Sequence, residues 1–124
     1  MPIVTIKLVT RDEAEYSDKQ QVQALADELG DLFGSGTGGT WVKVEFISMD
    51  MYAENRTEIA PSVQPTFVEV LKSELPSLDE RKVEALQIAQ VVAAGLHRPP
   101  ENVHVLYLPP AKGRMAFGGK LLDT

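Results

Sequence analysis

The sequence reads QQVQAL at residues 20–25 and RKVEAL at residues 81–86, so one pattern returns 61 positions further along (20 to 81). Two flanking pairs match in the same order and at nearly the same shift: PIVTI (2–6) with PTFVEV (65–70), and VKV (42–44) with VHV (103–105). A single match of this length arises easily by chance, whereas three in one order indicate an internal duplication. This duplication decides the predicted fold.

Each copy has the pattern of a strand, a helix and a second strand. Residues 3–9 are β-branched and apolar, as a strand requires. In the following run, apolar residues recur at helical spacing: Val22, Leu25, Ala26, Leu29 and Leu32. The closing strands are expected at 41–47 and 103–108. A unit this short normally joins two parallel strands through a right-handed crossover.

Two such units predict a single α+β domain over residues 1–124. Copy one covers about 2–50, a proline-bearing connector about 51–64, and copy two about 65–124. The two units are expected to form a four-stranded sheet with both helices on one face. Glycines in the tail, residues 111–122, favour a hairpin or arm there.

The helix ends carry their own signals. Capping-box spacing predicts both starts, with Ser17 paired to Gln20 and Ser77 paired to Glu80. Glycine and proline are expected to stop the helices at Gly30 and Gly34 in copy one, and at Gly95 and Pro99-Pro100 in copy two.

The two helices differ in how much of their surface is apolar. The second carries apolar residues around more of its circumference, which indicates burial against a neighbouring subunit. A sheet covered by helices on one face also leaves its other face and its edges unsatisfied. We therefore expect the chain to self-associate.

Composition narrows the possible partners and compartments. The 18 acidic and 12 basic residues give a net charge of −6, which disfavours nucleic acid. There is no cysteine and there are only two histidines, so no metal site is expected. No apolar run has membrane-spanning length and the start lacks a basic signal region, so we expect a cytoplasmic protein without a membrane partner.

Two candidate motifs have simpler explanations. Residues 34–39 satisfy the G-x-G-x-x-G pattern of dinucleotide-binding loops, but a helix precedes them and a strand follows, the reverse of that fingerprint. They are interpreted as a flexible loop. His97 suits a helix end, where it can contact terminal carbonyls. His104 lies on the strand face opposite Val103 and Val105, either as a packed sheet residue or as a substrate contact.

Pro2 carries the most distinctive chemistry. Proline after the initiator methionine permits removal of Met1, which would leave a secondary amine. An α-amino group has a pKa of about 8, and burial beside apolar residues such as Ile3 and Phe117 would lower it. A base poised near ambient pH suits proton transfer next to a carbonyl. The alternative is that Pro2 is only a rigid start to an edge strand.

The opening Pro2-Ile3-Val4, the two β-α-β copies and the tail AKGRMAFGGKL (111–121) together resemble the tautomerase superfamily. Within it, the chain is similar to a fused pair of 4-oxalocrotonate tautomerase units. The resemblance covers almost the whole chain. It implies a tautomerase/MIF-like mixed sheet, a homotrimer, no cofactor, and a small anionic substrate.

The resemblance also implies roles for residues. Pro2 would be the catalytic base, and substrate-binding residues would be Arg11, Lys72, His104, Arg114 and Met115. Family members bind the substrate with arginines, whereas the second arginine position here holds Lys43 or His104. Met115 replaces a family phenylalanine, and Arg114 could supply the missing cation. Pro65 corresponds to Pro2, but its nitrogen lies in a peptide bond, so one working site per chain is expected.

Three functions follow from these observations. The first is a keto–enol tautomerase acting on 2-hydroxy-dienoates or phenylenolpyruvate-like acids. The second is a dehalogenase or hydratase of an unsaturated acid, although the 115–117 stretch offers no carboxylate to activate water. The third is a non-catalytic trimeric binding module, which would hold if Met1 were retained and the Pro2 nitrogen remained an amide.

Overall fold

The protein is described by a computed structural model covering residues 2–16 and 18–124. The main elements follow the chain as β1 (Ile3–Thr10), α1 (Lys19–Phe33), β2 (Trp41–Ser48), β3 (Thr66–Leu71), α2 (Leu78–Leu96), β4 (Val103–Tyr107), β5 (Ala116–Phe117) and β6 (Lys120–Leu121). Three short 3₁₀ turns lie at Glu13–Tyr16, Met49–Met51 and Pro100–Asn102. Within the described residues, no helix is long and apolar enough to cross a bilayer.

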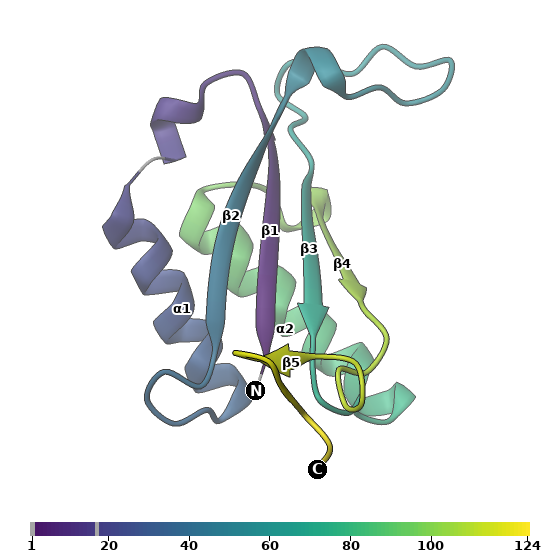
Figure 1. The fold of residues 1–124 in the computed structure, drawn as a ribbon. Helices are drawn as coiled ribbons and strands as arrows, with labels where there is room; N and C mark the ends of the chain where they lie inside the picture. Colours follow the sequence, from purple (N-terminus) through teal and green to yellow (C-terminus); the bar gives the residue numbers. More distant parts are fainter. Residues whose placement is uncertain (1, 17) are drawn as a thin grey trace.

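The four long strands form one mixed sheet in the order β2-β1-β3-β4. Each copy supplies a parallel pair, β1 with β2 and β3 with β4, and the copies join where β1 runs antiparallel to β3. Both helices cover the same face of the sheet (Figure 1). This confirms the predicted tandem β-α-β fold. The predicted tail hairpin is β5 paired with β6.

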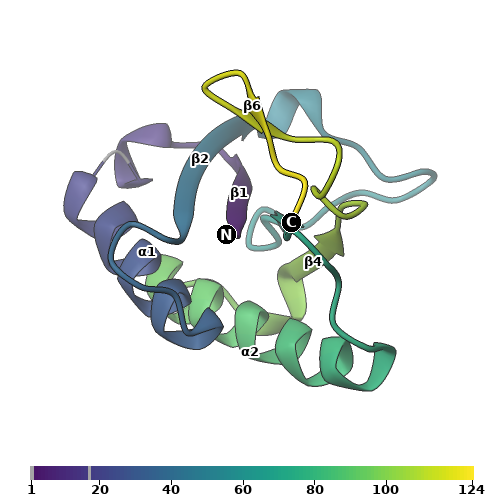
Figure 2. The ribbon, with the colours of Figure 1, turned by 60° about the horizontal axis from the view of Figure 1, so that its bottom comes forward.

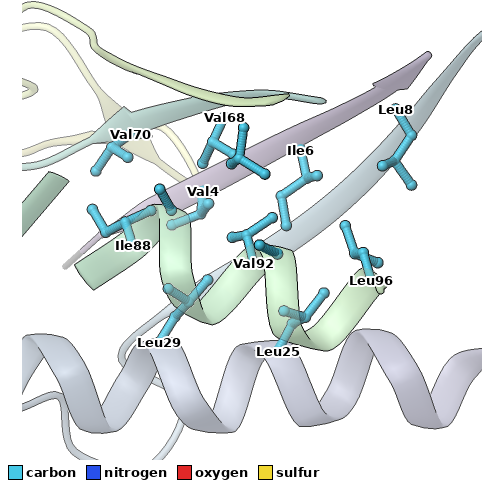
Figure 3. Packing of buried hydrophobic residues seen from close by; sticks show 13 residues of the cluster. Val4, Ile6, Leu8, Leu25, Leu29, Val68, Val70, Ile88, Val92 and Leu96 are labelled. Atoms are coloured by element: carbon cyan, nitrogen blue, oxygen red, sulfur yellow. The ribbon is translucent and has the colours of Figure 1, made fainter. Parts of the chain in front are cut away.

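The core lies between the sheet and the two helices (Figure 3). Alternate residues of β1 point towards the helices, where Val4, Ile6 and Leu8 are fully buried. Leu25 and Leu29 of α1 meet them from one side, and α2 contributes Ile88, Val92 and Leu96. Each such side chain stabilises the fold by about 1.5–3 kcal/mol through burial.

The observed helix starts follow the sequence signals in part. Ser77 caps α2 with the predicted capping box, because its side chain accepts from the Glu80 N–H while the Glu80 carboxylate accepts from the Ser77 N–H. The N-cap of α1 is Asp18, whose carboxylate accepts from the Gln20 N–H at 2.8 Å. Ser17, the predicted cap, lies outside the described residues.

The predicted helix stops are correct at one glycine and wrong at two. Gly34 ends α1 with a left-handed φ of 67°, as expected. Gly30, however, lies within α1, and Gly95 lies within α2. Gly95 is instead a close-packing site, since an added Cβ would lie 2.7 Å from a Leu25 methyl carbon. The helix ends two residues later at His97, which itself takes φ 55°.

Several large apolar side chains remain exposed on the single chain. Leu78, Val83 and Leu86 are about three-fifths exposed on α2, and Leu106 is similarly exposed on β4. The sheet face away from the helices is covered only in part, by the C-terminal hairpin, which Figure 2 shows on that side, and by Tyr52, whose ring centre lies 6.0 Å from that of Phe67. These surfaces are the ones from which self-association was predicted.

Candidate functional site

Pro2 lies directly before β1, which is one of the two inner strands of the sheet. Its neighbour Ile3 is paired with Trp41 of β2 on one side and Leu71 of β3 on the other. The Pro2 carbonyl accepts a hydrogen bond of 3.0 Å from the Trp41 N–H. Pro2 is therefore a buried residue held between two strands.

A pocket of about 360 Å³ opens beside Pro2. Besides Pro2, its lining comes from the loop that follows α1 and from the end of β3: Phe33, Gly34, Ser35, Gly36, Gly39, Lys72 and Ser73. Both parallel strands of copy one start at this edge, which is why the loop entering β2 lies next to Pro2. The topology thus builds a pocket wall from residues far from Pro2 in sequence.

The glycine-rich loop at 34–39 is tightly folded against itself. The Gly39 N–H donates to the Gly36 carbonyl at 2.9 Å, and the Ser35 and Thr40 hydroxyls are 2.6 Å apart. A Cβ added at Gly39 would lie 3.0 Å from the Gly36 oxygen. The predicted helix-to-strand loop is confirmed, but its role as a pocket wall was missed. The sequence signal for this role was the glycine content of a loop that joins the helix to the second strand of a β-α-β unit.

Lys72 is the charged side chain of the pocket. Its ammonium lies 3.0 Å from Glu84 Oε2 and 3.3 Å from Oε1, and 5.0 Å from the centre of the Phe33 ring. Tyr107 donates to Glu84 Oε1 at 2.7 Å. Burial, and then the hydrogen bond to Glu84, raises the pKa of the Tyr107 hydroxyl above its ordinary 10.0. Glu84 and Tyr107 were not predicted, because α2 and β4 meet Lys72 only in the folded chain.

Known proteins provide an independent comparison for this fold. No family model and no curated relative matches the chain. Among solved structures, Pt0534 inactivated by 2-oxo-3-pentynoate is 18% identical, with 97% of this chain and 94% of that chain covered and a TM-score of 0.74. The fused 4-OT F6, an asymmetric trimer, is 14% identical, with 97% and 95% covered and a TM-score of 0.73. A macrophage migration inhibitory factor homologue from Prochlorococcus marinus is 14% identical, with 98% and 99% covered and a TM-score of 0.70.

These structures are members of the tautomerase superfamily. The chain has the tautomerase fold. At such low identities the likeness concerns the fold, and it confirms the resemblance inferred from the sequence at that level. The match spans nearly the whole of both chains in each case, so the tandem arrangement itself is shared.

Of the predicted binding residues, the tautomerase fold brings Lys72 to Pro2 within one chain. Arg11 is placed at the far end, since it follows β1 whereas Pro2 precedes it. A strand of this length separates them by roughly 30 Å. Arg11 can therefore meet a proline site only in a neighbouring copy.

His104 also lies away from Pro2 in the same chain. It pairs with Phe67, which pairs with Lys7, five residues along β1 from Pro2. Its ring centre is 5.6 Å from that of Phe67, on the sheet face opposite the helices. His104 is exposed on that face, where it lines a pocket of about 460 Å³ together with Lys7 and Phe67, so a contact with a substrate at Pro2 would require a second copy.

Arg114 and Met115 line a separate pocket of about 260 Å³ near the same sheet end. Leu71, Leu108, Pro109 and Ala111 complete it. Leu71 directly precedes Lys72 and pairs with Ile3, so the two pockets are neighbours. The hairpin that follows is held by Phe117, whose ring meets Trp41 edge-on at 5.5 Å.

The matching proline of copy two, Pro65, has different surroundings. Pro65 is buried, and its carbonyl accepts from the Val9 N–H at 3.1 Å, as Pro2 accepts from Trp41. The buried Arg98 side chain occupies this end. Its guanidinium donates to the Val9 carbonyl at 2.9 Å, to the Thr66 hydroxyl at 3.3 Å and to the Gln64 carbonyl.

Metal chemistry has no evident ligand set in the described part of the chain. No group of three or more His, Asp or Glu side chains there is placed to hold a metal ion. The polar side chains that the described residues bring to the Pro2 pocket are the Lys72 ammonium and the Ser35 and Ser73 hydroxyls. These suit an anionic organic ligand, which an ammonium and hydroxyl donors can bind directly.

Proposed function

We propose that the protein is a cofactor-independent keto–enol tautomerase in which the amine of Pro2 is the general base. Its substrates are small 2-hydroxy-dienoate or phenylenolpyruvate-like acids. The observation that carries this proposal is the buried Pro2 beside a pocket whose charged side chain is the Lys72 ammonium. The tautomerase fold of the structural neighbours supports the reaction class.

The base requires that Met1 be removed, so that Pro2 bears a secondary amine. An ordinary α-amino group has a pKa of about 8. Burial beneath the loop of α1 disfavours the charged form and lowers the pKa of the amine further. An unprotonated fraction is then available near pH 7, which is the condition for efficient proton transfer.

The proposed reaction moves one proton and leaves the substrate's composition unchanged. Lys72 binds the substrate carboxylate, which places the enol or dienol beside the Pro2 nitrogen. That nitrogen takes a proton from one atom of the conjugated system, and the resulting ammonium returns it to another as the double bonds shift. Fixed positive charge lowers the barrier where negative charge develops on oxygen.

Residues from neighbouring copies complete the site in this proposal. Arg11, His104, Arg114 and Met115 are assigned to substrate binding within a homotrimer, because two of them cannot reach Pro2 in their own chain. The fused 4-OT structures are trimers, which supports this assembly. The exposed apolar face of α2 and the open sheet face provide the surface.

Intact mass and turnover test the proposal together. We expect the mass to show loss of Met1, and 2-hydroxymuconate or phenylenolpyruvate to be ketonised by the wild type. Retained Met1, or equal rates for wild type and Pro2→Ala, would remove the proline mechanism and leave the trimeric binding module. A dehalogenase or hydratase is less well supported, since no carboxylate lies among the described lining residues.

A further inference from the structure

The sheet face away from the helices carries a row of aromatic rings, with Phe67 between Tyr52 and His104. The Phe67 ring centre lies 6.0 Å from that of Tyr52 and 5.6 Å from that of His104. Aromatic rings attract one another at such separations. We propose that Phe67 of a neighbouring copy binds the aromatic ring of a substrate held at Pro2. The inference deepens the proposed function and rests on it for the reaction and the assembly.

Phe67 and His104 line a pocket of about 460 Å³ on this face. Leu106 also lines this pocket, and its side chain is 59% exposed in the single chain. The charged lining residues are Lys7 and Glu69, which form an ion pair with each other. Because these two charges are already paired, the pocket suits an apolar group. A phenyl ring placed there would lose contact with water against Phe67 and Leu106, which is favourable.

The pocket beside Pro2 offers little apolar surface for the rest of such a substrate. Apart from Pro2 and Phe33, its described lining consists of Lys72, glycine and serine. In the proposed function, Lys72 binds the substrate carboxylate, and Arg11 and Arg114 of neighbouring copies add further cations. The carboxylate end is thus provided for, however many cations reach it. The aromatic end still needs an apolar wall.

Phe67 can provide that wall only from another copy. Within one chain it pairs with Lys7, which lies about 16 Å along β1 from Pro2 at the rise of a strand. Phe67 also pairs with His104, which the proposed function assigns to the substrate in a neighbouring copy. A ligand that contacts His104 is therefore within reach of the Phe67 ring beside it.

Replacing Phe67 should affect aromatic substrates selectively. Phe67→Leu removes the ring but keeps an apolar side chain, so kcat/KM for phenylenolpyruvate should fall by about tenfold. 2-Hydroxymuconate has no ring, and its kcat/KM should change by less than about twofold. Phe46→Leu makes the same change where the side chain packs against the core, and should affect the two substrates equally. Thermal unfolding of each variant identifies any that fails to fold.

Mixed assemblies test whether Phe67 acts from a neighbouring copy. Chains with Pro2→Ala and chains with Phe67→Leu are co-expressed in equal amounts, and the whole mixture is assayed on phenylenolpyruvate. Every intact Pro2 then belongs to a Phe67→Leu chain, and about half of these prolines meet a neighbour with an intact Phe67. Activity per Phe67→Leu chain should rise about fivefold above that of the pure variant. No rise would overturn the inference.

The kinetic ratio can also overturn the inference. It fails if Phe67→Leu slows both substrates equally or slows neither. It also fails if Phe33→Leu alone causes the selective loss, since the ring would then lie on the aromatic side chain of the Pro2 pocket itself. In each case, Pro2-dependent turnover would leave the tautomerase proposal intact.

Binding measurements separate the two proposals if no Pro2-dependent turnover is found. Dissociation constants for 3-phenylpropionate and muconate are measured by NMR titration of the wild type and Phe67→Leu. A loss of about tenfold confined to 3-phenylpropionate would support the ring site and remove the reaction alone. Equal changes, or no binding of 3-phenylpropionate to the wild type, would remove the ring site as well.

Discussion

The two copies of the β-α-β unit begin with prolines in matching places, yet the described structure surrounds the two prolines differently. At Pro2, the loop after α1 consists largely of glycine and serine and leaves about 360 Å³ open. At Pro65, the segment after α2 supplies Arg98, whose side chain fills the corresponding end. The helix ends align Arg98 with Ser35, because each follows a left-handed cap residue, and their N–H groups donate to the Ala93 and Gly30 carbonyls respectively.

This difference shows how two copies of one backbone unit can surround matching prolines differently. The backbone frame is retained in both copies, since each proline carbonyl accepts a hydrogen bond from a backbone N–H of a neighbouring strand. What differs is the side chain that enters from the following loop. In copy two, the Arg98 guanidinium lies close to the proline, whereas copy one has a pocket beside it. The nitrogen of Pro65 is also held in a peptide bond, because this proline lies within the chain.

The largest expected effect compares the two prolines directly. Pro2→Ala should lower kcat/KM on phenylenolpyruvate by about 10²–10⁴-fold, because that is the contribution of a positioned general base. Pro65→Ala, the matched control, should leave the rate within about threefold. Steady-state assays of both variants measure this. Similar losses in the two variants would show that the effect is structural.

Arg98 provides the next test, this time of stability. Arg98→Ala leaves the Val9 and Gln64 carbonyls without their buried donor, so the free energy of unfolding should fall by about 2–4 kcal/mol. Thr37→Ala, at an exposed position in the corresponding loop of copy one, should change it by less than about 0.5 kcal/mol. Urea denaturation compares the two. Equal stabilities would mean that Arg98 does not hold the closed end together.

A third test compares a glycine within each helix. Gly95→Ala should destabilise by about 1–3 kcal/mol, since the new methyl would overlap Leu25 at 2.7 Å. Gly30→Ala should instead be neutral or stabilise by up to about 1 kcal/mol, because its Cβ would meet nothing closer than Thr40 at 3.9 Å. Thermal unfolding measures the change in stability of each variant, and we expect the two changes to have opposite signs.

The smallest effect concerns the capping box that distinguishes α2 from α1. The side-chain and backbone hydrogen bonds with Ser77 lower the pKa of Glu80 below 4.5. A lowered folded-state pKa adds stability above the unfolded value, and that stability is lost as the pH falls through the folded value. Glu80→Gln should therefore have a slightly lower free energy of unfolding than the wild type at pH 7, and this difference should disappear on acidification below about pH 4. A difference that grows in acid would contradict this prediction.

Much of the architecture was predictable because it depends on local pattern. The strand expected at 3–9 is found at Ile3–Thr10, and that at 41–47 is found at Trp41–Ser48. Gly95 was misread because a glycine near a helix end signals a stop in sequence, whereas its true constraint is the approach of Leu25 from another helix. Lys72 was predicted to bind substrate, and it lines the pocket beside Pro2.

The sequence by itself determined the duplication, the order of strands and helices, and the unusual chemistry available to Pro2, since these follow from periodicity and residue type. Only the tertiary structure decided that the Glu84 carboxylate accepts from both Lys72 and Tyr107 and that Arg98 closes the Pro65 end. Those contacts join residues 12 to 89 positions apart. Such distances carry no local pattern, and they are set by the packing of α2 and its following loop against the sheet.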